Sequence, residues 1–193
     1  PNVRILIYSD TATKAEKFLR GIKGHILGNY GQSRFKEFFG NLQPVDSVWN
    51  ESNIVVSTRR NSSVEPTVDT GGIDTSKVGM HYDIIFFDDI VSKLNVSTKL
   101  QMDKVFDCYN EALALLKPKG LVYLTGTRWH FNDSYGRLID RNEEIDAFDI
   151  YVKDSEETNV DGKLIYADTG LDREHLDSLR SSMGDYTYSC LMR

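Results

Sequence analysis

The feature that most constrains this chain is a run of four apolar residues that ends in two acids. Residues 83–89 read Asp-Ile-Ile-Phe-Phe-Asp-Asp, the strongest signal for a buried strand in the sequence. Such a run is typical of a strand buried on both faces, as in a parallel sheet covered by helices. Asp88 and Asp89 would then lie at the carboxyl end of the strand, where open α/β sheets bind ligands. The run therefore predicts both a fold class and a candidate site.

Strands and helices alternate along the rest of the chain. An apolar run at 3–8 predicts a first strand, and residues 12–26 carry one apolar helical stripe. A long amphipathic helix is expected at 97–116 and a second strong strand at 121–125. This alternation predicts an α/β fold with a mostly parallel sheet flanked by helices. The remaining expected elements are a short helix at 33–39, a small β meander inserted at 45–68, a flexible loop at 70–72 and Gly79, a short helix at 132–139, a strand at 148–152, a turn at 161–162 and a helix at 172–183.

Composition sets limits on the partners. The chain has 193 residues, 40% of them hydrophobic, which is one ordinary domain with a sizeable core. Its net charge of -6 provides no whole-surface attraction to nucleic acid or to an anionic membrane, so any phosphate contact must be local. No membrane span or signal peptide is visible, and the two cysteines are too few for a metal cage or a disulfide framework. We expect a soluble intracellular protein that is a fragment of a longer chain.

The two acids at the end of the 83–89 run match the Walker B pattern of ATP-hydrolysing proteins. In that pattern the first carboxylate, here Asp88, holds Mg²⁺, and the second, here Asp89, orients and polarises the attacking water. Adjacent carboxylates repel each other, which makes them costly as a purely structural device. The alternative interpretation is that one of them caps the turn that follows the strand.

A second polar segment follows the strand expected at 121–125. Thr125, Gly126 and Thr127 are small enough to lie close to a γ-phosphate and to respond when it leaves. Arg128, Trp129 and His130 follow directly and add a cation, an aromatic ring and a titratable ring. A simple glycine turn at a strand end is the alternative interpretation of this segment.

Together these motifs resemble the ATPase domain of the large terminase subunits of tailed bacteriophages. The resemblance is carried by the Walker B run at 83–90, about twenty-five residues of amphipathic helix, and the run Leu-Leu-Lys-Pro-Lys-Gly-Leu-Val-Tyr-Leu-Thr-Gly-Thr-Arg-Trp-His that ends at His130. Looser similarity extends to the first strand and to residues 176–190. It covers nearly the whole chain, so that 1–193 is similar to an ATPase domain without its Walker A segment, and about 145–193 to the tail that leads toward a nuclease domain.

The resemblance implies a P-loop NTPase core of the additional-strand type and a motor that uses ATP and Mg²⁺ to package double-stranded viral DNA. The motor would work as a homo-oligomeric ring on the portal protein together with a small terminase subunit, in the host cytoplasm and transiently at the procapsid. The full-length protein would also cut DNA. On the matching positions, Asp88 is the Mg²⁺ carboxylate, Asp89 the water-activating acid, and Thr125, Gly126 and Thr127 the coupling motif.

The sequence departs from this family pattern in three places. The phosphate-binding loop Gly-x-x-x-x-Gly-Lys-[Ser/Thr] is missing, so we expect it upstream of Pro1 and expect the fragment alone to be inactive. Asp89 stands where many ATPases have glutamate. The loop before Walker B offers Lys77 rather than an arginine for contact with a neighbour's phosphates, and lysine cannot make a bidentate contact. The other candidate phosphate contacts are Arg59, Arg60 and Arg128.

Two other functions fit parts of the sequence. Residues 83–88 followed by Leu-Leu-Lys-Pro-Lys-Gly also look like the fourth strand and following turn of class I S-adenosylmethionine-dependent methyltransferases. That family needs a glycine-rich loop after its first strand, and Ser-Asp-Thr-Ala-Thr at 9–13 is not one. The second alternative is a non-catalytic interaction module that packs against neighbouring subunits or the portal.

Overall fold

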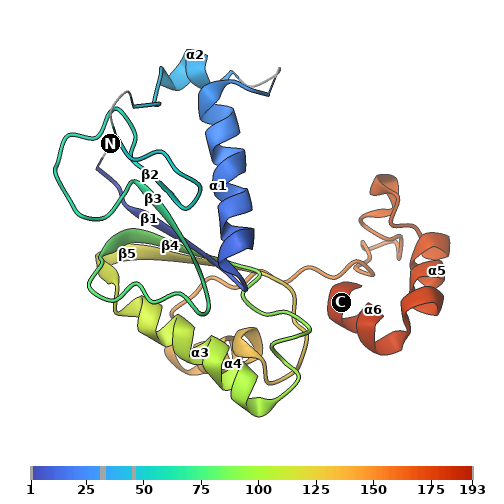
Figure 1. Cartoon of the computed structure of the whole chain (residues 1–193). Coiled ribbons are helices and arrows are strands. Elements are labelled where there is room, and N and C mark those ends of the chain that lie inside the picture. Colours follow the sequence, from blue (N-terminus) through green and yellow to red (C-terminus); the bar gives the residue numbers. More distant parts are fainter. Residues whose placement is uncertain (1, 31–33, 45–46, 193) are drawn as a thin grey trace. The chain divides into compact units, whose positions relative to one another are not determined.

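A computed structural model describes residues 2–30, 34–44 and 47–192 (Figure 1). The chain divides into two compact units, Pro1–Gly126 and Thr127–Arg193. The first unit contains the whole sheet, and the second contains only helices and irregular segments among the residues described. The predicted α/β fold with a mostly parallel sheet and flanking helices is confirmed.

The sheet of the first unit has five strands in the order β2-β3-β1-β4-β5. The central strands β3, β1, β4 and β5 run parallel to one another, and only the short β2 is antiparallel to its neighbour. The strand at 83–88 thus lies inside the sheet, as its apolar run predicts. The strands are β1 (Ile5–Ser9), β2 (Asn53–Ile54), β3 (Val68–Gly72), β4 (Tyr82–Asp88) and β5 (Leu116–Thr125).

Helices begin where the sequence supplies capping side chains. Thr11, Thr98, Asp133 and Asp172 each accept a hydrogen bond from the amide three residues later. None of the helices among the described residues is long and apolar enough to cross a membrane. The helices are α1 (Ala12–Leu27), α2 (Phe35–Phe39), α3 (Lys99–Leu113), α4 (Ser134–Ile145), the 3₁₀ helix η1 (Ala167–Thr169), α5 (Arg173–Met183) and α6 (Asp185–Met192).

The first unit buries apolar residues on both faces of its sheet. On one face, Ile7 of β1 and Val68 of β3 pack in a cluster with Ala15, Leu19 and Ile26 of α1. On the β4–β5 half of the sheet, Phe86 and Tyr123 stack at 4.9 Å and stay 36% and 47% exposed.

The other face is an aromatic layer between the sheet and α3. Tyr8 of β1 stacks on Phe87 of β4 at 5.7 Å, and Phe87 meets Tyr109 of α3 at 5.2 Å. All three side chains are at most 3% exposed. These contacts fix the position of β4, and therefore of the two acids at its end.

The predicted loop at 70–72 is wrong, because these residues form the end of β3. Gly71 and Gly72 lie where other parts of the unit approach closely. A Cβ on Gly71 would come within 2.8 Å of the Tyr8 ring, and one on Gly72 within 2.4 Å of the Ala12 amide nitrogen. The glycines that suggested a flexible loop are thus close-packing positions of a buried strand.

The predicted β meander at 45–68 is also largely wrong, and residues 45–46 lie outside the described part. The segment forms the two-residue strand β2, and Ile54 also makes an isolated bridge with Trp49. The run near Val68 instead enters the main sheet as β3, beside β1. Strand β2 lies at the edge of the sheet and is two residues long, so few backbone hydrogen bonds join this segment to β3. The rest of the segment is irregular.

The predicted strand at 148–152 does not form either. Its residues are irregular, and Ile150, Tyr151 and Val152 are 45%, 80% and 67% exposed. A strand requires a neighbour that takes up its backbone hydrogen bonds, and no strand among the described residues pairs with this segment. The turn at 161–162 and the helix at 172–183 are confirmed, whereas the predicted short helix at 132–139 is the longer α4.

A buried ion cluster lies at the amino end of the sheet. The Arg4 guanidinium donates to both oxygens of Asp83, at 3.0 and 3.1 Å, and lies 3.5 Å from Glu65. Arg4 and Glu65 are 6% and 8% exposed. The cluster ties the start of β1 to the start of β4 and to the segment before β3.

Because of this cluster, the free energy of unfolding is expected to fall at acidic pH. Burial raises the pKa of Glu65, but hydrogen bonds from Ser63 and the His81 amide and the charge of Arg4 outweigh it, and the pKa falls from 4.5 to about 2. A depressed folded-state pKa contributes stability that is complete above about pH 4.5 and is lost as the pH falls toward 2.

Glu65→Gln is therefore expected to flatten the decline in the free energy of unfolding between pH 5 and pH 2, relative to the unsubstituted chain. Urea unfolding at several pH values measures this slope. Glu37→Gln is the control, because Glu37 makes only an exposed ion pair with Arg34. Parallel slopes for Glu65→Gln and the unsubstituted chain would contradict the assignment.

Candidate functional site

The parallel strands β4 and β5 bring Asp88 and Thr125 together. The two residues are register partners at the carboxyl ends of their strands. Thr125 Oγ1 donates a hydrogen bond of 2.6 Å to Asp88 Oδ1. Residues 37 positions apart in the sequence thus form one polar pair at the edge where α/β sheets bind ligands.

Asp89 turns the chain away from β4 in a left-handed backbone conformation. Its φ is 49°, in the left-handed region, which glycine, asparagine and aspartate tolerate best. Its amide donates to the Thr125 carbonyl at 3.0 Å, so the turn is anchored to β5. Asp89 is exposed and Asp88 half-buried. The edge therefore presents one carboxylate held by a hydroxyl and a second in contact with solvent.

The polar segment after β5 runs into the second unit. Gly126 ends the first unit and Thr127 begins the second. Arg128, a candidate phosphate contact, donates from Nη2 to the Phe131 carbonyl at 2.9 Å and remains exposed. The Asn132 amide donates to His130 Nδ1 at 3.0 Å, which leaves the proton of the neutral ring on Nε2.

Sequence reasoning missed Asp133, which organises this segment. Its side chain is fully buried and accepts three amide hydrogen bonds, from Trp129 at 2.9 Å, His130 at 3.1 Å and Gly136 at 2.9 Å. The Trp129 carbonyl in turn accepts a 2.6 Å hydrogen bond from Tyr186 of α6. An aspartate directly before a helical apolar pattern is an N-cap signal, and that signal could have identified Asp133.

The structure does not bring Lys77, Arg59 or Arg60 to Asp88. Lys77 Nζ lies 2.9 Å from the carboxylate of Asp69, a buried residue of β3, and this ion pair holds the Lys77 side chain beside that strand. The Arg60 amide donates to the Asn2 side chain at 3.0 Å. Arg59 and Arg60 therefore lie at the amino end of the parallel strands, opposite the end that carries Asp88. Both Nη atoms of Arg59 are buried without a hydrogen-bond partner among the described residues.

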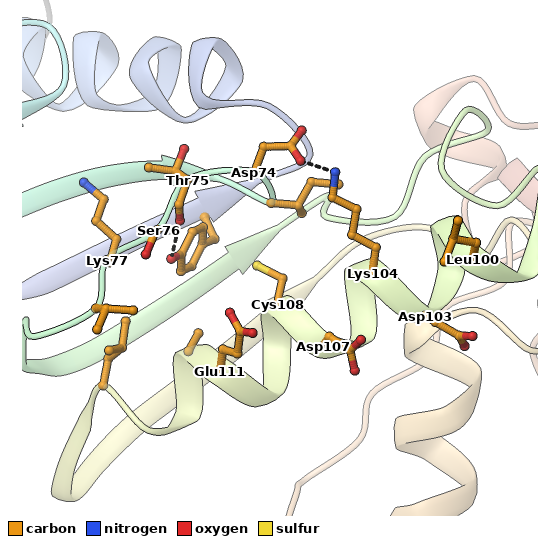
Figure 2. Close-up of a pocket in the computed structure, with 15 residues that line it drawn as sticks. Asp74, Thr75, Ser76, Lys77, Leu100, Asp103, Lys104, Asp107, Cys108 and Glu111 are labelled. Carbon is orange, nitrogen blue, oxygen red and sulfur yellow. Dashed lines mark hydrogen bonds and ion pairs between the residues drawn. The ribbon is translucent and has the colours of Figure 1, made fainter.

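A separate pocket of about 570 Å³ lies between the segment after β3 and helix α3 (Figure 2). Asp74 and Lys104 form an ion pair across it, and Tyr8 donates to the Thr75 carbonyl at 3.2 Å. Burial, and then the nearby Glu111 and Asp74, raise the pKa of the Cys108 thiol to about 11. Of the residues predicted for the site, only Lys77 lines this pocket. The pocket is therefore distinct from the strand-end pair.

The strand-end residues fit Mg²⁺ only if water and the phosphates of a bound nucleotide complete its coordination shell. No group of three or more metal-ligating side chains occurs among the residues described. Mg²⁺ in phosphate-transferring sites commonly uses one or two carboxylates, with water and substrate phosphates completing its shell. Asp88 suits that arrangement. The sequence's single Gly-Lys pair, Gly162–Lys163, lies in a turn closed by Asn159 rather than between a strand and a helix, so it does not provide a phosphate loop.

Comparisons with protein-family models and with curated protein sequences find no match to this chain.

Proposed function

We propose that this chain is part of an ATP-driven motor that packages double-stranded DNA into a viral capsid, with hydrolysis at Asp88 and Asp89. The observation that carries the proposal is the strand-end pair: an apolar strand ends in two acids, and the first accepts a hydrogen bond from Thr125 on the neighbouring strand. This arrangement supports a hydrolytic phosphate site better than a cap of the following turn, because the hydrogen bond that Asp88 accepts comes from Thr125 on the neighbouring strand rather than from an amide of that turn.

Each residue has a distinct role in this proposal. Asp88 holds Mg²⁺, and the hydrogen bond from Thr125 fixes the orientation of its carboxylate. Asp89 accepts a hydrogen bond from the attacking water and polarises it. When bound, Mg²⁺ neutralises charge on the transferred phosphoryl group. Because the amide of Asp89 is anchored to Thr125, a shift of either acid is transmitted to the start of the Thr125-Gly126-Thr127 segment.

The proposal includes partners and parts beyond the residues described. The phosphate-binding loop is supplied by sequence that precedes Pro1, and a cation from a neighbouring subunit completes the site in a homo-oligomeric ring. Arg60, which is exposed and lies away from Asp88 in its own chain, is a candidate for that contact in a neighbouring subunit, whereas both Nη atoms of Arg59 are buried in its own chain. The ring works with a portal protein and a small terminase subunit in the host cytoplasm, and a further nuclease domain cuts the DNA.

Substitutions at Thr125 and Thr127 test the proposal in the polypeptide that includes the preceding sequence. Thr125→Val keeps the side-chain shape but removes the donor to Asp88, so ATP turnover is expected to fall about 10-fold or more. Thr127→Ala is expected to reduce DNA translocation more than ATP binding, because a hydroxyl that follows the γ-phosphate matters for the response to hydrolysis.

ATPase, ATP affinity and translocation are measured side by side, with Thr58→Val as the control for an exposed threonine. Unchanged turnover in Thr125→Val would remove the strand-end pair from the chemistry. Equal, near-normal translocation and turnover in Thr127→Ala would remove the coupling role, leaving Thr127 as a structural residue.

A further inference from the structure

Positive charge is concentrated in one stretch of an otherwise acidic chain. Residues 12–39 contain six lysines and arginines against two glutamates, a net charge of +4 in a chain whose total is -6. The remaining residues therefore carry -10. Such an asymmetry indicates a local surface for an anionic partner, although the whole chain repels one.

Helix α1 turns three of these cations toward the side opposite the core. Ala15 and Leu19 are fully buried against the sheet. At 100° per residue, Lys14, Lys17 and Arg20 fall within an arc of about 120° on the opposite side. All three are exposed. The outward side of the first half of α1 therefore carries a row of positive side chains.

Helix α2, near the carboxyl-terminal end of α1, carries two further cations. Figure 1 shows α2 at the carboxyl-terminal end of α1, within the same unit. Its segment contributes Arg34 and Lys36, both exposed, together with Phe38 and Phe39, which are 70% and 63% exposed. We call Lys14, Lys17, Arg20, Lys23, Arg34 and Lys36 the α1–α2 cationic surface.

Only two of these six cations form an ion pair with an acid in the described part of the chain. Lys14 pairs with Asp10 at 2.9 Å, Arg34 pairs with Glu37 at 2.9 Å, and Lys23 donates to the Asn50 carbonyl at 3.1 Å. No ion pair joins Lys17, Arg20 or Lys36 to a described acid. These three charges are therefore available to a partner without first breaking a salt bridge.

We propose that the α1–α2 cationic surface binds the phosphate backbone of a DNA duplex. The cations of α1 are spaced along the helix from Lys14 to Lys23, over about 14 Å, so a partner with several negative charges along its length, a polyanion, can meet more than one of them. A duplex presents a phosphate about every 1.7 Å along its axis, so several cations are neutralised at once. The choice of duplex DNA rests on the proposed packaging function, whereas the choice of a polyanion rests on the charges alone.

A charge-matched pair of triple variants tests the proposal in the chain as printed. Variant one carries Lys17→Gln, Arg20→Gln and Lys36→Gln. The control carries Lys93→Gln, Lys99→Gln and Lys163→Gln, three exposed lysines outside the surface. Fluorescence anisotropy with a labelled 30-base-pair duplex is measured between 50 and 200 mM salt, without nucleotide, and circular dichroism checks that both variants fold.

The unsubstituted chain and the control are expected to bind with equal affinity within twofold, and variant one at least 10-fold more weakly at 50 mM salt. The slope of log affinity against log salt should become shallower in variant one by about 2.7, since each lost phosphate contact removes about 0.9. These outcomes do not depend on hydrolysis. Duplex binding is measured without nucleotide and ATP turnover in a separate assay, so failure of this inference is distinguishable from failure of the ATPase proposal.

Several results would overturn the inference. They are an absence of duplex binding by the unsubstituted chain at 50 mM salt, equal affinities and slopes for the two triple variants, and single strands that bind more than 10-fold tighter than duplexes. Poly-glutamate that competes as well as DNA of equal charge would point instead to an acidic protein partner, and would also overturn it.

Discussion

Replacing Asp89 by asparagine is expected to lower ATP turnover at least 100-fold in the polypeptide that carries the phosphate-binding loop. The amide cannot polarise water as a carboxylate does, and general-base assistance typically contributes 10²–10⁴-fold. Asparagine tolerates the left-handed conformation that Asp89 adopts, so the turn after β4 should persist. Affinity for MgATP is therefore expected to stay within about threefold, since the loss concerns the reaction rather than ground-state binding.

Asp88→Ala separates the roles of the two acids. It removes the proposed magnesium carboxylate and the acceptor of the Thr125 hydrogen bond, so both turnover and the Mg²⁺ dependence of nucleotide binding should be lost. Asp107→Asn, an exposed acid in the middle of α3, is the control and should behave as the unsubstituted protein. Turnover within threefold of normal in Asp89→Asn would remove Asp89 from the water-orienting role.

Arg4→Ala is expected to lower the free energy of unfolding by about 3–5 kcal/mol, the usual cost of leaving a buried charge without its partner. The substitution leaves Asp83 and Glu65 without the guanidinium that lies between them. It also detaches the start of β1 from the start of β4. Urea or thermal unfolding of the chain measures the loss.

A control variant and a rescue variant accompany this prediction. Lys14→Ala removes an exposed ion pair with Asp10 and should cost no more than about 1 kcal/mol. Combining Arg4→Met with Glu65→Gln and Asp83→Asn should recover part of the loss, because no buried charge then remains unpaired. If Arg4→Ala destabilises the chain no more than Lys14→Ala does, the cluster contributes little to the stability of the fold.

Strong local signals predicted the framework of the sheet. The apolar runs of β1 and β4 and the stripe of α1 were each identified because burial, strand and helix periodicity agree within a few residues. The sequence also located Asp88 and Thr125 at strand ends. Their hydrogen bond could not be predicted, since it depends on the register of β4 against β5 across 37 positions.

The errors share one physical cause, which is that local composition does not show what lies next to a segment. Gly71 and Gly72 suggested a loop, but their missing side chains make room for Tyr8 and the start of α1. The apolar segment at 148–152 suggested a strand, but no neighbouring strand among the described residues pairs with it. In each case a tertiary neighbour decided the outcome.

The left-handed backbone of Asp89 also sets stability against activity at this position. Glycine adopts a φ of 49° without steric cost, so Asp89→Gly should relieve local strain in the folded chain. The same substitution deletes the carboxylate on which the proposed chemistry depends. A selection for thermal resistance alone would therefore favour an inert protein here, and retention of the acid would indicate selection for turnover rather than for folding.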